Sequence, residues 1–298
     1  MSITSFKILF FLLFFMMGIG QSQAASEFRL GVINERPEQP DDALKQYGKL
    51  HQYLERELSA KGHQPIELVI ARSVDEMVTC INNREVDALI EGVMPTLAIK
   101  QRGAEIDPTL LIWRKGQREY HTVFFVRRDS AINTLEDLHG KTIVFEAPRS
   151  TSAFFVPKTE LLAASLKLGA IEDTTLTADA VRYMFAGSEL NQAYWVHRGR
   201  AASGAFNDGD WERVPEAIKD ELKIIHHTRP ILRWLFSFTP TIDPGVREAV
   251  VSTLLSAHTN ELGEEALQQA EQIKMFERLT PSDQENLDYW ANVLKSSQ

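Results

Sequence analysis

The chain is poor in cysteine and in positive charge. Cys80 is the only cysteine among the 298 residues, so an intramolecular disulfide is excluded and the stability of an exported chain would have to come from its core. The 41 acidic residues outnumber the 32 lysines and arginines. Nucleic acid and anionic lipid need basic patches, so we expect neither as a partner. An anion would have to be attracted by charges local to its site.

The sequence also lacks internal repeats, low-complexity tracts and Gly/Ser-rich linkers, which favours domains connected by strands over a flexible tether. No His, Cys or carboxylate cluster has the spacing of a metal site, and the adjacent His226 and His227 would point to opposite faces of a strand. We therefore expect no metal and no cofactor. No Gly-x-Ser-x-Gly motif occurs, and no base can be placed beside Ser150 or Ser152, so an enzyme is not expected.

The amino terminus is typical of a secretory signal peptide. Lys7 precedes an apolar run from Ile8 to Met17, and Ser22-Gln-Ala24 supplies the small residues of a cleavage site. A transmembrane anchor is the alternative, but the apolar run is shorter than the about 20 residues that span a bilayer. We predict that residues 1–25 are a signal peptide. Its removal changes the net charge from −9 to −10, because Lys7 is its only charged residue.

The remaining sequence is long enough for two domains and alternates between strand and helix patterns. The first part predicts a parallel sheet with helices on both faces, and hence an α/β fold, from strands at 28–33, 66–70 and 86–90 and helices at 42–60 and 73–81. From Leu110 the pattern changes. We predict strands at 110–113 and 121–126 around a charged turn, a helix at 178–186, strand pieces at 192–196 and 203–206, a crossover strand at 223–230, and helices from Pro244 to the end.

A stretch in the middle of the chain has the pattern of an anion-binding loop. The β-branched run Lys141–Phe145 predicts a buried strand that stops before Pro148, and three hydroxyl residues, Ser150–Ser152, then begin a helical pattern that extends to Leu168. Pro157 predicts a short first turn followed by a kink. The first amides of a helix have no internal partner and can bind an anion. The alternative is a plain helix cap.

Several segments in this order resemble the phosphate/phosphite/phosphonate-binding periplasmic proteins of ABC importers, a branch of the type II periplasmic binding proteins. They are Val86–Gly92, Val126–Val144, Ser150–Ser152 with Pro157, and Thr228–Pro230. The resemblance implies a periplasmic, monomeric protein with two α/β lobes and a ligand cleft between them. Two crossover strands near Gly116 and His227 would join lobe 1 (26–118 plus 229–298) to lobe 2 (119–228). It also implies that lobe closure captures a small oxyanion for an ABC permease.

The resemblance assigns Ser150, Thr151 and Ser152 as oxyanion donors. It also makes Tyr47 a candidate, because the family can place a ligand-contacting aromatic residue there; packing in the core is the alternative. Three more candidates follow from their places at strand ends: Tyr120 and His121, which could simply pack, and Asp208, which could be a solvated loop residue.

Four positions depart from the family pattern. Ala153 stands where a glycine is usual, Glu91 where an aromatic residue is common, and Ala178 where phosphonate binders carry a histidine. Arg233, with Trp234, stands where aminophosphonate binders place a carboxylate. Glu91 and Arg233 are also candidate ligand-binding residues. A carboxylate at Glu91 would repel a fully ionised phosphate, but it could accept a hydrogen bond from a protonated anion or pair with a ligand cation or an arginine. Arg233 and Trp234 would suit an anionic or flat ligand better than an aminoalkyl tail. Two other functions remain open: a periplasmic sensor that feeds a membrane histidine kinase, and a soluble enzyme on the same fold.

Overall fold

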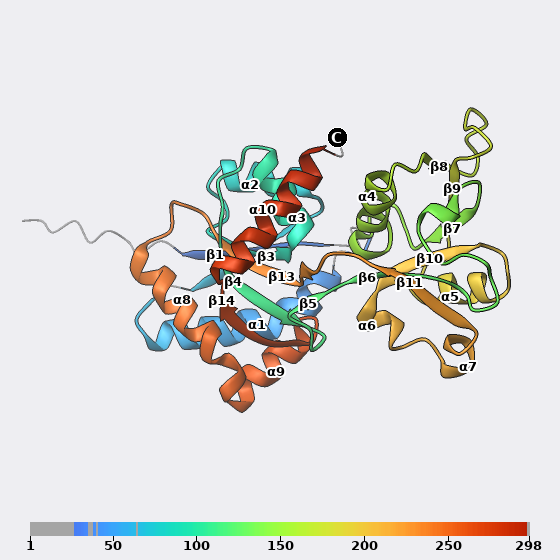
Figure 1. The fold of residues 1–298 in the computed structure, drawn as a ribbon. Helices are drawn as coiled ribbons and strands as arrows, with labels where there is room; N and C mark the ends of the chain where they lie inside the picture. The colour runs from blue at the N-terminus through green and yellow to red at the C-terminus, as the bar shows by residue number, and fades with distance from the viewer. Residues whose placement is uncertain (1–26, 35–37, 40, 64, 297–298) are drawn as a thin grey trace, which may run out of the picture.

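The structure is a computed structural model that describes residues 27–34, 38–39, 41–63 and 65–296. The predicted signal peptide lies outside these residues. The described residues form two units side by side (Figure 1). Each unit is built on a six-stranded sheet. The two sheets are joined by a two-stranded ribbon.

The first sheet is mixed. β1 pairs in parallel with β2 and β3, as the alternating pattern predicted, whereas β13, β4 and β14 are added in antiparallel orientation. Its order is β14 (Ile273–Arg278), β4 (Asp107–Arg114), β13 (Trp234–Phe238), β3 (Ala88–Gly92), β1 (Phe28–Ile33) and β2 (Ile66–Ala71).

The second sheet repeats this plan, with parallel pairing among β10, β7, β9 and β8 and antiparallel pairing of β6 with β10 and β11. Its order is β11 (Leu222–His227), β6 (Thr122–Arg127), β10 (Ser203–Asn207), β7 (Thr142–Phe145), β9 (Val181–Phe185) and β8 (Leu168–Ala170).

Helices cover both faces of each sheet. Those of the first unit are α1 (Asp41–Ala60), α2 (Val74–Asn82), α3 (Val93–Gln101), α8 (Pro244–Ser256), the 3₁₀ turn η3 (Ala257–Thr259), α9 (Glu261–Gln269) and α10 (Pro281–Ser296). Those of the second unit are the 3₁₀ turn η1 (Glu136–Leu138), the π-helical turn η2 (Thr151–Phe155), α4 (Val156–Ala163), α5 (Glu189–His197), α6 (Asp208–Trp211) and α7 (Glu216–Lys219).

α1 shows how the pattern builds the first core. Its apolar stripe, including Leu50, Leu54 and Leu58, is fully buried against the first sheet. Leu44, near the start of the helix, is 57% exposed and does not join this stripe. The helix stops before Gly62, whose positive φ of 81° favours glycine.

The predicted helix at 178–186 is wrong. Residues Val181–Phe185 form β9, and Val181, Tyr183 and Phe185 all face the cluster that includes Phe145. This spacing of two residues fits a strand, and aromatic and β-branched residues favour strands. The segment was misread because a run of five residues fits both periods.

The predicted strand at 192–196 is also wrong. Ser188 caps a helix there, accepting a hydrogen bond from the amide of Asn191 (3.2 Å), and Gln192, Ala193 and Val196 are buried at helical spacing. The Gln192 side chain is fully buried and accepts a hydrogen bond from the amide of Ala205 (3.1 Å). A buried amide in place of an apolar residue hid the helical period.

The prediction of helices from Pro244 to the end is wrong in one place, because the carboxyl-terminal part also contains a strand. β14 at Ile273–Arg278 interrupts the helices and pairs with β4 at the edge of the first sheet. The helix after Ser150–Ser152 likewise ends at Ala163 instead of reaching Leu168, which begins β8. In both places a short strand follows a helix directly.

The ribbon between the two units consists of β5 (Glu119–Tyr120) and β12 (Ile231–Leu232), which pair antiparallel. The predicted crossover strand at 223–230 is therefore misplaced, because Leu222–His227 is β11 of the second sheet and the chain crosses after Pro230. The strands predicted around the charged turn, β4 and β6, belong to different sheets. The first crossover lies close to Gly116, as expected.

Candidate functional site

The loop Ser150–Ser152 follows β7 and begins the π-helical turn η2. Ser150 caps this turn, because its hydroxyl accepts a hydrogen bond from the amide of Ala153 (3.1 Å) and its carbonyl accepts one from Phe155 (2.9 Å). The predicted short first turn ahead of Pro157 is thus present. Ser150 therefore acts as a helix cap, which was the alternative to an anion-binding role.

Pro157 explains the unusual turn. A proline has no amide to donate, so a carbonyl one turn earlier needs another partner. The carbonyl of Ser152, five residues before Pro157, accepts a hydrogen bond from the Thr122 hydroxyl (2.8 Å). The carbonyl of Ala153 accepts one from the amide of Glu146 (3.1 Å). These bonds attach the loop to β6 and to the end of β7.

The loop presents donors that the protein itself does not use. The amides of Thr151 and Ser152 and the Thr151 hydroxyl make no hydrogen bond with any other described residue. The first amides of a helix lack internal partners and lie at the positive end of its dipole. An oxyanion is the ligand that such a group of donors suits.

A buried arginine lies beside this loop. Arg233, between β12 and β13, is 9% exposed, and its guanidinium lies over the ring of Tyr120 at 4.5 Å. It donates to the side-chain oxygens of Gln117 and of Asn207 (3.3 Å), and Asn207 in turn donates to the Ser152 hydroxyl (3.4 Å). One side chain therefore separates the arginine from the loop.

Part of the Arg233 guanidinium is unused. Its Nε atom is buried and has no hydrogen-bond partner among the described residues. Burial lowers the pKa of Arg233 from its ordinary value. A buried donor without a partner destabilises a protein, and a buried cation does so more. An anion bound between Arg233 and Ser150–Ser152 would relieve both.

Asp208 and His121 lie next to this group. The Asp208 carboxylate accepts hydrogen bonds from the Gln117 side chain (2.8 Å) and from the amide of His121 (3.3 Å). His121 Nδ1 lies 2.7 Å from the carbonyl of Thr228, so Nδ1 carries the proton because a carbonyl only accepts. These contacts join the start of β6 to α6 and to the second crossover. Asp208 is thus an anchored residue of this group.

Tyr120 and Arg233 are brought together, and two other predicted residues, Tyr47 and Glu91, lie in the first unit. Tyr47 is 4% exposed within the core under the first sheet. Glu91 ends β3 with 7% exposure, and its carboxylate accepts a hydrogen bond from the amide of Gly92 (2.7 Å). Val93, two residues after Glu91, shares a buried cluster with Val156 of the second unit, so the end of β3 lies near the contact between the units.

Asn207 and Gln117 were missed as site residues. Asn207 ends β10 and caps α6, accepting from the amide of Asp210 (3.0 Å). A cap after a strand at the carboxyl edge of a sheet is a position where ligands bind, and this signal was available. Gln117 lies in the charged turn before β5. No sequence pattern distinguishes it from its neighbours.

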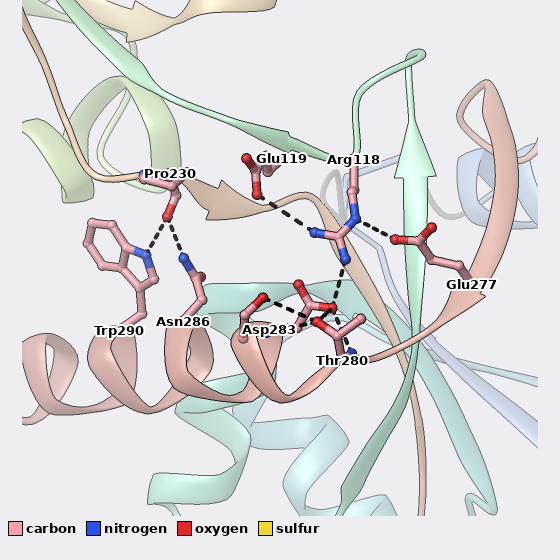
Figure 2. A network of polar contacts seen from close by, with 9 residues as sticks. Arg118, Glu119, Pro230, Glu277, Thr280, Asp283, Asn286 and Trp290 are labelled. Atoms are coloured by element: carbon pink, nitrogen blue, oxygen red, sulfur yellow. Dashed lines mark hydrogen bonds and ion pairs between the residues drawn. The ribbon is translucent and has the colours of Figure 1, made fainter.

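Side chains of α10 bond to both crossover segments (Figure 2). Arg118, just before β5, forms an ion pair with Glu277 and another with Asp283 (2.7 Å). The carbonyl of Pro230, just before β12, accepts hydrogen bonds from Asn286 (2.8 Å) and from Trp290 (3.1 Å). The same helix therefore holds both strands of the ribbon.

The start of α10 is well capped. Thr280 and Asp283 exchange hydrogen bonds: the Asp283 carboxylate accepts from the Thr280 amide (2.8 Å), and the Thr280 hydroxyl accepts from the Asp283 amide (3.3 Å). Burial would raise the pKa of Asp283, but the bonds from Arg118 and Thr280 outweigh it and hold that pKa below its usual value. The carboxylate is 2% exposed, so its charge depends on these partners.

Comparison with known proteins identifies the family. A model of the family described as "ABC transporter, phosphonate, periplasmic substrate-binding protein" matches residues 36–284. The chain belongs to this family. It is a solute-binding protein, and membership implies a periplasmic location, a small-molecule ligand and a membrane permease as partner.

Solved structures agree on the fold. XAC2383 from Xanthomonas citri, solved bound to chloride ion and bound to ATP, is 28% and 27% identical with TM-scores of 0.76 and 0.77; the alignments cover 90% and 91% of this chain and 97% and 98% of the other. PhnD1 from Prochlorococcus marinus in complex with methylphosphonate is 16% identical, with a TM-score of 0.61 over 90% of this chain and 98% of its own. The binding protein thus has the two-lobed type II periplasmic binding protein fold.

Among the described residues, no group of three or more His, Cys, Asp or Glu side chains could hold a metal ion. None of the helices in that part of the chain is both long and apolar enough to cross a membrane. His226 bonds to Glu160 (2.7 Å), and the His227 ring lies edge-on to His121 at 6.3 Å between centroids.

Ala178 is exposed in the loop that leads into β9, and so it lies at the amino end of that strand. Ligands of open α/β sheets bind at the carboxyl ends of strands. Ala178 therefore lies at the opposite edge of the sheet from the loop Ser150–Ser152, which follows the carboxyl end of β7. Ser188 and Glu189, which follow the carboxyl end of β9, are nearer to it.

Glu189 has an unusual ionisation. Burial, together with the negative charge of Glu146, raises the pKa of Glu189 to about 6. A raised carboxyl pKa means that the folded protein holds a proton that the unfolded chain releases, with its ordinary glutamate pKa of about 4.3. The stability that protonated Glu189 contributes is therefore fully present below the unfolded pKa of about 4.3, and it is lost as the pH rises through the folded pKa of about 6.

We predict that Glu189→Gln removes this dependence. The variant should melt at a higher temperature than the wild type at pH 7.5, where the buried carboxylate is ionised, and the difference should shrink at pH 5. Thermal melts at both pH values measure it. Glu285→Gln, at an exposed site on α10, controls for the loss of one negative charge. An equal difference at both pH values would contradict the prediction.

Proposed function

We propose that this binding protein captures a small oxyanion, a phosphonate or phosphate-like group, and delivers it to an ABC importer. The observation that carries the proposal is the buried, unused Nε of Arg233 beside the unused donors of Ser150–Ser152. The chain acts by binding and not by turnover in this proposal, and needs neither metal nor cofactor. The acidic net charge of the whole chain does not oppose it, because Arg233 acts at close range.

The donors suit a tetrahedral anion. The amides of Thr151 and Ser152 and the Thr151 hydroxyl belong to the loop, and the Arg233 guanidinium belongs to the crossover segment. In this proposal, separate oxygens of one group each receive a bond from these donors. Each charge-assisted hydrogen bond of this kind contributes about 1.5–3 kcal/mol. Desolvation of Arg233 strengthens its attraction for the anion.

Lobe closure around the anion forms part of the proposal. Residues 26–118 with 229–298 would move as one lobe and residues 119–228 as the other, with β5 and β12 as the hinge. Val93 and Val156, one from each lobe, already share an apolar cluster with Tyr120 of the hinge. Residues 1–25 are proposed to be removed on export, and the mature chain to act as a monomer.

The breadth of ligand is part of the test. XAC2383 was solved bound to ATP and PhnD1 with methylphosphonate, and both ligands present phosphorus-bound oxygens. We propose that this chain recognises that shared group. A screen of the purified protein should compare methylphosphonate, phosphate, phosphite, ATP and an alkylsulfonate by thermal shift. A ligand at 100 times its Kd stabilises the folded state by about 2.7 kcal/mol.

If no oxyanion raises the melting temperature while a cation or a neutral solute does, the proposal is wrong. Hydrolysis of a bound phosphonate or phosphate ester would instead favour the enzyme alternative. Stimulation of a membrane histidine kinase by the ligand-loaded protein, without uptake through a permease, would favour the sensor.

Thr151→Ala is predicted to weaken oxyanion binding about tenfold to 100-fold, the loss of one charge-assisted hydrogen bond. The melting temperature of the ligand-free protein should not change, because this hydroxyl bonds to no described residue. Ser150→Ala is the matched control. It removes the cap of η2 and should cost about 1 kcal/mol of stability. Calorimetric titration and melts separate the two effects. A Thr151→Ala protein that fails to fold would make the loop a structural cap only.

A further inference from the structure

Gln117 lies between a cation and an anion that do not touch. Its side-chain oxygen accepts a hydrogen bond from Arg233, and its side-chain nitrogen donates to the Asp208 carboxylate at 2.8 Å. Among the described residues Arg233 forms no ion pair, although Asp208 is near enough to raise its pKa. An amide that accepts on one side and donates on the other satisfies both charged groups without letting them pair.

The backbone at Gln117 is held in a tight turn. Arg114 and Gln117 exchange backbone hydrogen bonds of 3.0 and 3.1 Å across Lys115 and Gly116. These two central residues have φ of 53° and 79°, as a type I′ hairpin turn requires. The turn belongs to the first unit and leads directly into the hinge. Gln117 therefore reaches Asp208 of the second unit from a rigid support.

The second unit leaves room for this side chain at one position. A Cβ atom at Gly209 would lie 2.5 Å from the Gln117 oxygen and 2.9 Å from its Cδ. Any other residue at position 209 would push the amide away. The bare backbone of Gly209 thus sets where the Gln117 amide lies, one residue after the carboxylate to which it bonds.

This separation bears on how available the Arg233 guanidinium is to a ligand. Opposite charges in direct contact in a partly buried site attract strongly, and an arginine that is paired internally offers less to a ligand. Arg114 and Asp210 also influence Arg233, but Arg114 is paired with Glu271 and Asp210 with Arg213 (3.2 Å). In the described part of the chain, the Asp208 carboxylate bonds only to neutral groups, so it can compete for Arg233.

We propose that Gln117 is a positioning residue, a neutral spacer that prevents Asp208 from pairing with Arg233 and so keeps the arginine available to an anionic ligand. This inference rests on the proposed oxyanion-binding function. It adds a residue that touches no ligand yet sets the affinity.

A double-mutant cycle tests it, with methylphosphonate and inorganic phosphate as probes in calorimetric titrations. Gln117→Ala should weaken binding about tenfold, because Arg233 and Asp208 then pair. Asp208→Asn in the Gln117→Ala background should restore most of the affinity, since the competing charge is gone. If Gln117 were merely structural, the two substitutions would lower the affinity independently and their effects would add. That result would overturn the proposal.

Gly209→Ala displaces the Gln117 side chain without changing it, and should weaken binding in the same way and be rescued by the same Asp208→Asn change. Gly48→Ala is the matched control, because a Cβ at Gly48 meets no atom within 4 Å. Unchanged affinity in Gly209→Ala, with the protein folded, would contradict a spacer held at this position.

A measurement without ligand separates this inference from the proposed function. In the Gln117→Ala protein, Asp208→Asn should lower the melting temperature because it breaks the new ion pair, whereas in the wild type it should change little. If this difference is seen but no oxyanion binds the wild type, the spacer is supported and the ligand class is wrong. If oxyanions bind but no such difference is seen, the spacer is wrong and the proposed function stands.

Discussion

Arg118→Met is expected to destabilise the folded protein by about 3–5 kcal/mol, the largest effect on stability that we predict. Asp283 is 2% exposed, and Arg118 is its only cationic partner within the described residues. The variant would leave this carboxylate buried with only the Thr280 bonds, and would free Glu277 as well. Urea unfolding at pH 7.5, followed by circular dichroism, measures the loss.

The controls follow from exposure and charge. Arg127→Met removes an ion pair with Asp129 that is largely solvent-exposed, and should cost at most about 1 kcal/mol. Asp283→Asn added to Arg118→Met removes the uncompensated charge and should recover part of the stability. An Arg118→Met protein as stable as the Arg127→Met protein would show that the contacts of α10 with the hinge carry little energy.

The same variant has a pH dependence with a definite sign. The pKa of Asp283 is held below its usual value, so its contribution to stability is present above the unfolded pKa and is lost as the pH falls through the folded pKa. Without Arg118 that pKa rises. The stability difference between wild type and Arg118→Met should therefore narrow in acid, which repeating the urea titration at low pH checks.

Arg233→Met is expected to weaken oxyanion binding about 100-fold or more, the loss of charge-assisted hydrogen bonds of about 1.5–3 kcal/mol each. The ligand-free variant should be as stable as the wild type or more so, because the cation that is removed is buried and makes no ion pair with any described residue. Titration with methylphosphonate and phosphate, together with melts of the ligand-free protein, measures both quantities.

Arg229→Met is the matched control for Arg233. Arg229 lies in the same crossover segment but is exposed and rests on the Tyr289 ring at 4.4 Å. It should bind oxyanions like the wild type. Arg233→Lys keeps the charge but loses the planar guanidinium, and should fall between the two. Oxyanion affinity that survives in Arg233→Met would remove this residue from the site.

The candidate site was partly visible in the sequence. Hydroxyl residues after a buried strand indicated a helix start with unused amides, and this follows from local chain geometry alone. Arg233 was noticed because an arginine stands where relatives carry a carboxylate. Gln117 and Asn207 were not, because their significance comes from contacts between residues 26 to 116 positions apart in sequence.

Two of the errors in the fold, at residues 178–186 and 192–196, have one physical cause. Segments such as Val181–Phe185 and Gln192–Val196 are five residues long, too short to distinguish a period of two from one of 3.6. Contacts with neighbouring residues determine the secondary structure of both segments. β9 is a strand that pairs with β7, and α5 is a helix that Ser188 caps and that the buried Gln192 attaches to β10. Long periodic segments such as α1 were predicted correctly, because many of their residues follow the same period.

By itself, the sequence determined the α/β class, the absence of a disulfide, the position of the loop Ser150–Ser152 and the turn ahead of Pro157. These depend on composition, on chain-local hydrogen bonding and on the missing amide of proline. Only the tertiary structure decided which residues meet that loop. Arg233 is a usable cation because burial removes its water, Asn207 links it to Ser152, and Gln117 separates it from Asp208. Burial and through-space charge depend on what folding brings together, and no pattern along the chain encodes them.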